Sequence, residues 1–128
     1  MMNNTYKVNV NHTINVTSQD INDIMCSALE GGICYWANKA EVVGKYLGEW
    51  AHEQISRGGS LILHDAESDD KWELNRENLL NGIAKAYEDN WFTDYGWCDG
   101  KTIDTCQVDA EVADTIIQLA LFGKVVFG

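Results

Sequence analysis

The sequence predicts a small α+β domain, in which a mostly antiparallel sheet packs against three to five helices. Two observations support this fold class: apolar residues recur at helical spacing in several segments, and short segments of alternating apolar and polar residues lie between them. The sheet is expected to contain an N-terminal strand or hairpin, a central hairpin and a C-terminal strand. A length of 128 residues and a hydrophobic content of 45% fit a single domain over residues 1–128.

The first half of the chain is predicted to be a strand followed by helices. Residues 6–16 alternate polar and apolar side chains, as in a half-buried strand or hairpin. Residues 17–20 supply N-cap chemistry for a helix that ends at the glycine pair 31–32. Helical spacing of apolar residues continues over 33–43 and again over 46–56, which predicts either one kinked helix or two.

The second half is predicted to contain the central hairpin and two more helices. Residues 60–64 and 71–74 form the hairpin and flank an acidic turn at residues 65–70. Asn75 can cap the next helix, and Asp109 can cap the last one. The buried side of the helix after Asn75 is expected to carry Leu79, Leu80, Ile83 and Tyr87.

Two further segments complete the prediction. Residues 88–108 lack periodicity and carry four aromatic residues among aspartates, so we expect a long loop that could act as a lid. After the last helix, Gly123 releases the chain into residues 125–127, which are predicted to be the strand that closes the sheet.

The net charge restricts the classes of partner. Nine Lys and Arg against twenty Asp and Glu give a formal net charge of -11. Such a charge repels duplex DNA, RNA and anionic membranes at long range, and it attracts a basic protein surface. The sequence also lacks a signal peptide and any run of about 18 apolar residues. We therefore expect a cytoplasmic protein with no direct nucleic-acid binding and no membrane association.

No cofactor or metal site is predicted. The four cysteines, Cys26, Cys34, Cys98 and Cys106, do not have the spacing of a zinc site, and in the cytoplasm they are expected to be reduced. The acidic turn at residues 65–70 lacks the twelve-residue loop, central Gly and terminal Glu of an EF-hand.

The sequence does not predict an enzyme. Helical spacing would place Glu49 and His52, or Glu49 and Glu53, on one face, where a carboxylate can orient an imidazole as a general base. A Glu-His pair of this kind is common on protein surfaces. Ser and Cys nucleophile motifs, a P-loop and a dinucleotide fingerprint are all missing from the sequence.

The candidate binding residues are aromatic, glycine-rich or acidic. The segment Arg57-Gly58-Gly59 offers backbone N–H groups beside a guanidinium, although a glycine turn into a hairpin needs only left-handed backbone geometry. Tryptophans could stack on a base or anchor a partner, but Trp36 shares its helical phase with core positions. The predicted ligand-binding or partner-binding residues are Trp36, Trp50, Glu53, Arg57, Gly58, Gly59, Asp69, Asp70, Trp91 and Trp97.

Two blocks of the sequence, ALEGGICYWANKAEVVGKYLGEWAHEQISRGGSLILHDAE and DAEVADTIIQLALFGKVVFG, resemble a family of small acidic proteins encoded by phages, prophages and mobile elements of Firmicutes. The resemblance covers roughly residues 21–80 and 109–128. It carries over no catalytic residue. What it implies is a context, because accessory proteins of mobile elements frequently inhibit host defence, for example by blocking CRISPR nucleases or by sequestering nucleotide immune signals.

Three functions are compatible with this context. In the first, the protein is a non-enzymatic inhibitor that docks an acidic surface, including residues 65–70 and 88–104, on a basic host defence protein. In the second, it is a sponge for a nucleotide signal such as a cyclic ADP-ribose isomer. The signal is bound by Trp36, Arg57, the following glycines and aromatic residues of the long loop, in a pocket between protomers of a homo-oligomer. The third is a housekeeping role in the life cycle of the element.

Overall fold

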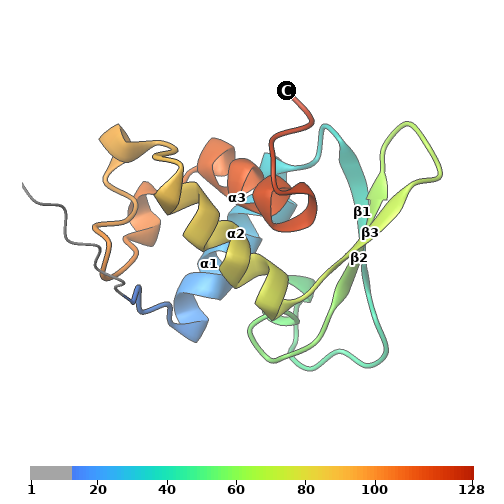
Figure 1. Cartoon of the computed structure of the whole chain (residues 1–128). Coiled ribbons are helices and arrows are strands. Elements are labelled where there is room, and N and C mark those ends of the chain that lie inside the picture. Colours follow the sequence, from blue (N-terminus) through green and yellow to red (C-terminus); the bar gives the residue numbers. More distant parts are fainter. Residues whose placement is uncertain (1–12) are drawn as a thin grey trace, which may run out of the picture.

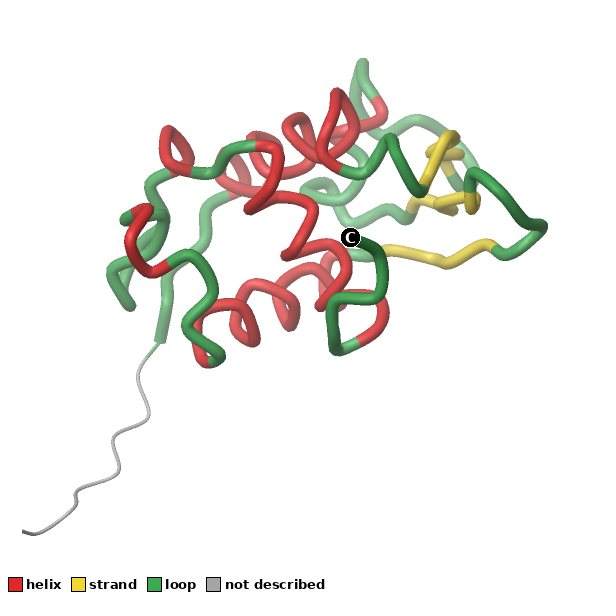
Figure 2. Tube along the Cα trace, turned by 90° about the horizontal axis from the view of Figure 1, so that it is seen from above, coloured by secondary structure: helices red, strands yellow, loops and turns green. Residues whose placement is uncertain are grey.

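Three α-helices and one three-stranded sheet make up the part of the chain described by the structure, residues 13–128 of a computed structural model (Figure 1). The helices are α1 (Ser18–Ser27), α2 (Arg76–Glu88) and α3 (Ala110–Phe122), and the strands are β1 (Ala37–Val42), β2 (Leu61–Asp65) and β3 (Lys71–Leu74). The helices lie together, and the sheet stands at one end of them in both views (Figures 1 and 2). The predicted α+β fold is confirmed.

The first helix begins and ends where the sequence predicts. The Thr17 Oγ1 accepts a hydrogen bond from the Asp20 N–H at 3.0 Å, and an Asp20 carboxylate oxygen accepts one from the Thr17 N–H at 3.0 Å. This reciprocal capping box satisfies two N–H groups that a helix start leaves free. α1 then continues into one π-helical turn, Ala28–Gly32. Gly32 is buried against α3, where a Cβ would lie 2.6 Å from the Ala110 carbonyl oxygen.

The prediction of a helix over residues 33–43 is wrong. The chain makes only a turn at residues 33–36 and then extends into β1, which pairs antiparallel with β2. Alanine, lysine and glutamate favour a helix here, but pairing with a neighbouring strand outweighs such weak local preferences. The second predicted helix, over 46–56, is also wrong, since only Ala51–Glu53 forms a short 3-10 helix.

The central hairpin is confirmed, and its register separates two faces of the sheet. β2 pairs with β3 so that Leu61 lies opposite Leu74 and Leu63 opposite Trp72 on the face toward the core. The other face carries polar residues with one isoleucine: Lys39, Glu41, Ile62, His64, Lys71 and Glu73. The strand order is β1-β2-β3, which leaves β1 and β3 as the edges.

The caps of the two later helices are confirmed. The Asn75 side chain accepts from the Asn78 N–H at 2.8 Å, and the Asp109 carboxylate accepts from the Val112 N–H at 2.9 Å. One predicted core position is wrong, because Leu80 is 38% exposed. Leu80 follows the buried Leu79, and one step along a helix turns a side chain by about 100° away from the packed face.

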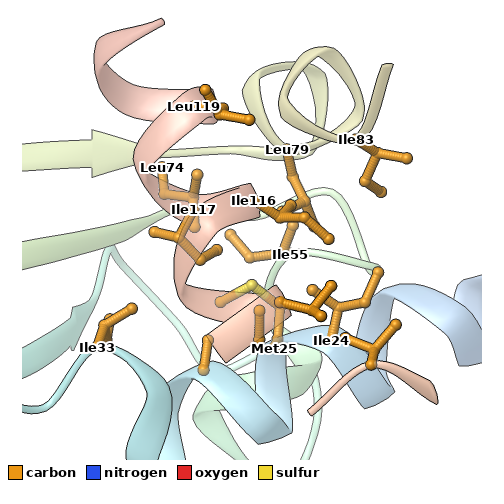
Figure 3. Packing of buried hydrophobic residues seen from close by; sticks show 14 of the residues in the cluster. Ile24, Met25, Ile33, Ile55, Leu74, Leu79, Ile83, Ile116, Ile117 and Leu119 are labelled. Atoms are coloured by element: carbon orange, nitrogen blue, oxygen red, sulfur yellow. The ribbon is translucent and has the colours of Figure 1, made fainter. Parts of the chain in front are cut away.

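Helix α3 lies at the centre of the hydrophobic core. Residues 112–119 are all buried, so this helix is covered on every side. In Figure 3, Ile116 and Ile117 lie among Met25 from α1, Leu79 from α2 and Ile55 from the segment between β1 and β2. The core therefore joins all three helices to the chain that leads into the sheet.

The predicted C-terminal strand is wrong. Gly123 ends α3 in the left-handed conformation, with φ of 70°, and the following residues form no strand. The Gln118 Oε1 instead accepts hydrogen bonds from the N–H groups of Val126 at 2.7 Å and Phe127 at 2.8 Å. The Phe127 ring stacks on Trp36, with centroids 4.8 Å apart. A side-chain amide and an aromatic stack thus replace sheet pairing for this segment.

The segment predicted as a long loop is folded. Residues 88–108 contain two 3-10 turns, Thr93–Tyr95 and Thr105–Gln107. Trp97, between these turns in the sequence, is buried. Most of the predicted N-terminal strand lies outside the described residues. Its described end makes a single bridge, between Asn15 and Thr102. No helix within residues 13–128 has the length and apolar character needed to cross a membrane.

Two glycines in different surroundings, Gly82 at the contact between α2 and α3 and Gly31 in the turn after α1, predict different results for substitution by alanine. At Gly82 a Cβ would lie 2.6 Å from the Ile116 carbonyl oxygen and 2.8 Å from the Ala120 Cβ, so G82A should lower the free energy of unfolding by about 1–3 kcal/mol. At Gly31 a Cβ would meet nothing within 4 Å, so G31A should be neutral or stabilise by up to about 1 kcal/mol. Urea unfolding measures both, and equal effects would contradict the described packing.

Candidate functional site

The chain between β1 and β2 exposes four large apolar side chains close together in the sequence. They are Val43, Tyr46, Leu47 and Trp50, with exposed fractions of 44%, 62%, 46% and 58%. We call residues 43–50 the apolar loop. Because large apolar side chains are seldom exposed so close together in a sequence, this loop is a candidate site of interaction with other molecules.

The buried side chain of Gln54 fixes the path of the apolar loop. Gln54 is 1% exposed. Its Oε1 accepts from the Leu47 N–H at 3.0 Å, and its Nε2 donates to the carbonyl oxygens of Lys45 at 3.1 Å and Val43 at 3.5 Å. A buried amide that bonds three backbone groups specifies one loop conformation, because any other would leave these groups unpaired.

An ion pair lies beneath the apolar loop at Gly48. The Glu53 carboxylate accepts from the Trp50 N–H at 3.2 Å and pairs with the Arg57 guanidinium at 3.2 Å. At Gly48 a Cβ would lie 2.8 Å from the Arg57 Nε and 2.9 Å from the Glu53 Oε2. Because the Arg57 side chain is 54% exposed, the pair adds little stability, and its main effect is to position the loop.

Five of the predicted binding residues meet at this loop. Trp50 belongs to it, Glu53 and Arg57 support it, and the turn Gly58-Gly59 leads back to β2. Gly59 packs directly on Gln54, where a Cβ would lie 2.5 Å from the Nε2. The sequence-based prediction missed three exposed members of the surface: Val43, Tyr46 and Leu47. A signal for them exists, since Gly44 and Gly48 flank Tyr46 and Leu47 and interrupt the predicted helix.

The predicted acidic residues lie elsewhere. Asp69 and Asp70 are exposed in the turn between β2 and β3. This turn and the apolar loop lie at opposite ends of the sheet, since β1 pairs its first residue with the last residue of β2 and its last residue with the first. Within the turn, the Asp65 carboxylate accepts from the N–H groups of Glu67 and Ser68.

Two of the predicted tryptophans are core residues. Trp36 is 3% exposed and Trp97 is 2% exposed, so neither offers a face to a ligand. The indole N–H of Trp36 donates to Asp114 at 2.8 Å, and that of Trp97 donates to the Trp91 carbonyl oxygen at 2.8 Å. Trp91, like Trp50, is exposed, with 36% of its surface accessible at the start of the connection between α2 and α3.

The glycine turn also borders a polar cleft of about 510 Å³. Its lining consists of Gly58, Ser60, Asn75, Arg76, Glu77, Leu80 and Asn81. Arg76 and the start of α2 would suit a phosphate, but this lining contains no aromatic side chain on which a base could stack. Within one protomer, this cleft therefore offers groups that suit a phosphate but no aromatic ring that could stack on the base of a nucleotide.

The carboxylate and imidazole groups form no catalytic arrangement at this loop. Within residues 13–128, His52 makes no hydrogen bond with Glu49 or Glu53, and no three His, Cys, Asp or Glu side chains are placed to hold a metal ion. On the polar face of the sheet, the His64 Nε2 lies 3.0 Å from the Glu41 Oε1. This hydrogen bond lowers the pKa of Glu41 below its usual value.

Comparison of the chain with protein-family models, with curated proteins and with solved structures gave no match.

The Gln54 contacts predict a local effect of Gln54→Ala. Removal of the amide leaves the Leu47 N–H without an acceptor, so hydrogen exchange at this amide should accelerate by about tenfold or more, the equivalent of one hydrogen bond. The exposed Gln107→Ala is the matched control and should leave the Leu47 amide unchanged. NMR-detected hydrogen exchange measures this, and an equally slow Leu47 amide in Gln54→Ala would show that Gln54 does not hold the loop.

Proposed function

We propose that this protein is a non-enzymatic binding protein that docks on a basic face of a protein partner through the apolar loop. The observation that carries the proposal is the exposure of Tyr46, Leu47 and Trp50 on a loop whose backbone is held by the buried Gln54. Tyrosine and tryptophan dominate the energy of protein interfaces, because they bury a large area at a small cost in side-chain entropy.

The apolar loop has a defined conformation before a partner binds, which supports a role in binding. Association is weakened by the free energy needed to order flexible segments, and a loop fixed in advance avoids much of this cost. Three backbone groups of the loop already have their partner in Gln54. A loop held only by solvent would have to be ordered during binding.

The net charge supports a basic partner. A charge of -11 raises the encounter rate with a positively charged surface and disfavours nucleic acid. Near the apolar loop itself the charges balance, with Lys45 and Arg57 beside Glu49 and Glu53. In the proposed complex, long-range attraction brings the partner close and the aromatic side chains hold it.

The partner class that we propose is a host defence protein of a bacterium. This part of the proposal rests on the resemblance of residues 21–80 and 109–128 to proteins of phages and mobile elements, which implies an inhibitor of the anti-CRISPR kind. A sponge for a nucleotide signal is the second candidate, and the polar cleft with Arg76 favours it. It is the weaker one, because aromatic residues are absent from the lining of that cleft.

Phage plating tests the proposed function. The protein is expressed in cells that each carry one defence system, and the wild type should restore plating of phage on one of them. Trp50→Ala and Leu47→Ala should lose this effect, since loss of a central interface residue weakens binding by about 2 kcal/mol, or about thirtyfold. Val126→Ala shortens an exposed apolar side chain outside the loop and outside the lining of the polar cleft, and it should act like the wild type.

Direct binding then separates the two candidate functions. For a defence protein blocked in the plating assay, calorimetric titration should show binding that weakens at high salt and in Trp50→Ala. Two results together would contradict docking and support the sponge. Trp50→Ala would still restore phage plating, and a cyclic ADP-ribose isomer would raise the melting temperature of the protein. If the protein restores phage plating on none of the defence systems, a defence protein is not its partner.

A further inference from the structure

A pocket with aromatic walls lies at the other end of β1 from the apolar loop. It has a volume of about 400 Å³ and is formed by the start of α3, the turn before β1, the beginning of the connection between α2 and α3, and the C-terminal segment. Its aromatic lining residues are Tyr35, Trp91, Phe92 and Phe127. Tyr35 and Trp91 are 52% and 36% exposed, so their rings are accessible from solvent.

The charged side chains in this pocket are all acidic. Glu111 and Asp114 belong to the lining, and no Lys, Arg or His does. Asp114 is only 8% exposed and accepts hydrogen bonds from Tyr35 Oη at 2.6 Å, Trp36 Nε1 at 2.8 Å and Gln118 Nε2 at 2.9 Å. All three donors are neutral, and no Lys, Arg or His forms an ion pair with Asp114 among the described residues.

The tyrosine beside this carboxylate stays neutral at physiological pH. Although the ring is exposed, desolvation of the hydroxyl and its hydrogen bond to Asp114 raise the pKa of Tyr35 to about 12. Its hydroxyl therefore remains a donor to Asp114, and its ring keeps the electron-rich face of a phenol without adding charge. At the rim, the Tyr95 hydroxyl lies 3.5 Å from the Glu111 carboxylate, and the Tyr95 ring lies against Phe92.

The walls are fixed before any ligand arrives. The Gln118 amide accepts from the N–H groups of Val126 and Phe127 and donates to the Phe127 carbonyl oxygen at 3.1 Å. The Tyr35 hydroxyl lies 3.2 Å from the same carbonyl oxygen. The C-terminal wall is thus held by the residues that hold Asp114, which favours a preformed pocket over one created by binding.

These observations disfavour an anionic ligand and favour a cationic one. The start of α3 would attract an anion, but Asp109 already caps it, and both Glu111 and Asp114 would repel a phosphate. Aromatic faces attract a cation placed over them, and carboxylates accept hydrogen bonds from guanidinium and ammonium groups.

We propose that this pocket binds a guanidinium or alkylammonium group, with Tyr35 and Trp91 packed against the cation and Glu111 accepting its hydrogen bonds. Two sources share this chemistry: the side chain of an arginine or lysine in a protein, and a free alkyl amine. The site is separate from the apolar loop, and binding of a cation there does not depend on the proposed docking function.

Titration of the ¹⁵N-labelled protein with N-acetyl-arginine methylamide, at low salt, tests the proposal. The amide signals of Tyr35 and Glu111 and the indole signal of Trp91 should shift and saturate at millimolar concentrations. Glu111→Gln should weaken binding by about tenfold, the effect of one charge-assisted hydrogen bond. Glu77→Gln, an exposed glutamate in the polar cleft, is the matched control and should not change the affinity.

Parallel titrations distinguish the source of the cation and the two sites. Tighter binding of the arginine derivative than of putrescine assigns the pocket to a protein side chain, whereas the reverse order assigns it to a free amine. Trp50→Ala should bind both ligands as the wild type does, so this experiment succeeds or fails independently of docking. Unshifted pocket signals with both cations, equal affinity of Glu111→Gln, or binding of inorganic phosphate in the pocket would overturn the proposal.

Discussion

The hydrogen bonds of Asp114 and Gln118 on α3 hold together parts of the chain that are far apart in the sequence. Because a buried carboxylate is costly unless its oxygens accept hydrogen bonds, Asp114 requires the donors of Tyr35 and Trp36 in place. Gln118, one turn further along, bonds to Asp114 and to the segment after α3. Since α3 is also the centre of the hydrophobic core, this polar pair ties the start of the sheet to the helices.

The position of the sheet sets the positions of the apolar loop and of the pocket with aromatic walls. Trp36 is anchored to α3, and β1 begins at the next residue. The pocket with aromatic walls lies at this anchored end. The apolar loop follows the far end of β1 (Figure 1). The loop is nevertheless not a flexible connection, because Gln54 is buried beside Ile55, a core residue, and fixes three of its backbone groups. The exposed aromatic side chains of the loop and of the pocket are thus carried by segments that are bonded to the core.

The sequence predicted the elements whose signals are local. The Thr17, Asn75 and Asp109 caps, the hairpin and the end of α3 at Gly123 depend on residues a few positions apart, and all were confirmed. The errors arose where distant groups decide the structure. Residues 37–42 form a strand because β2 pairs with them, and residues 125–127 form none because Gln118 takes their N–H groups. Five of ten candidate site residues meet at one loop, but Trp36 and Trp97 are buried. The spacing of Trp36 indicated a core position, whereas Trp97 lies in a segment without periodicity that gave no such signal.

The central claim is that the apolar loop is ordered before any partner binds, and ¹⁵N relaxation of the free protein tests it most directly. If Gln54 fixes the loop, the backbone order parameters of Tyr46, Leu47 and Trp50 should be about 0.85, the value of rigid backbone, and should match those of β2. Values below about 0.6 at these residues, with β2 rigid, would contradict the account. The aromatic side chains would then belong to a flexible segment and not to a preformed docking surface.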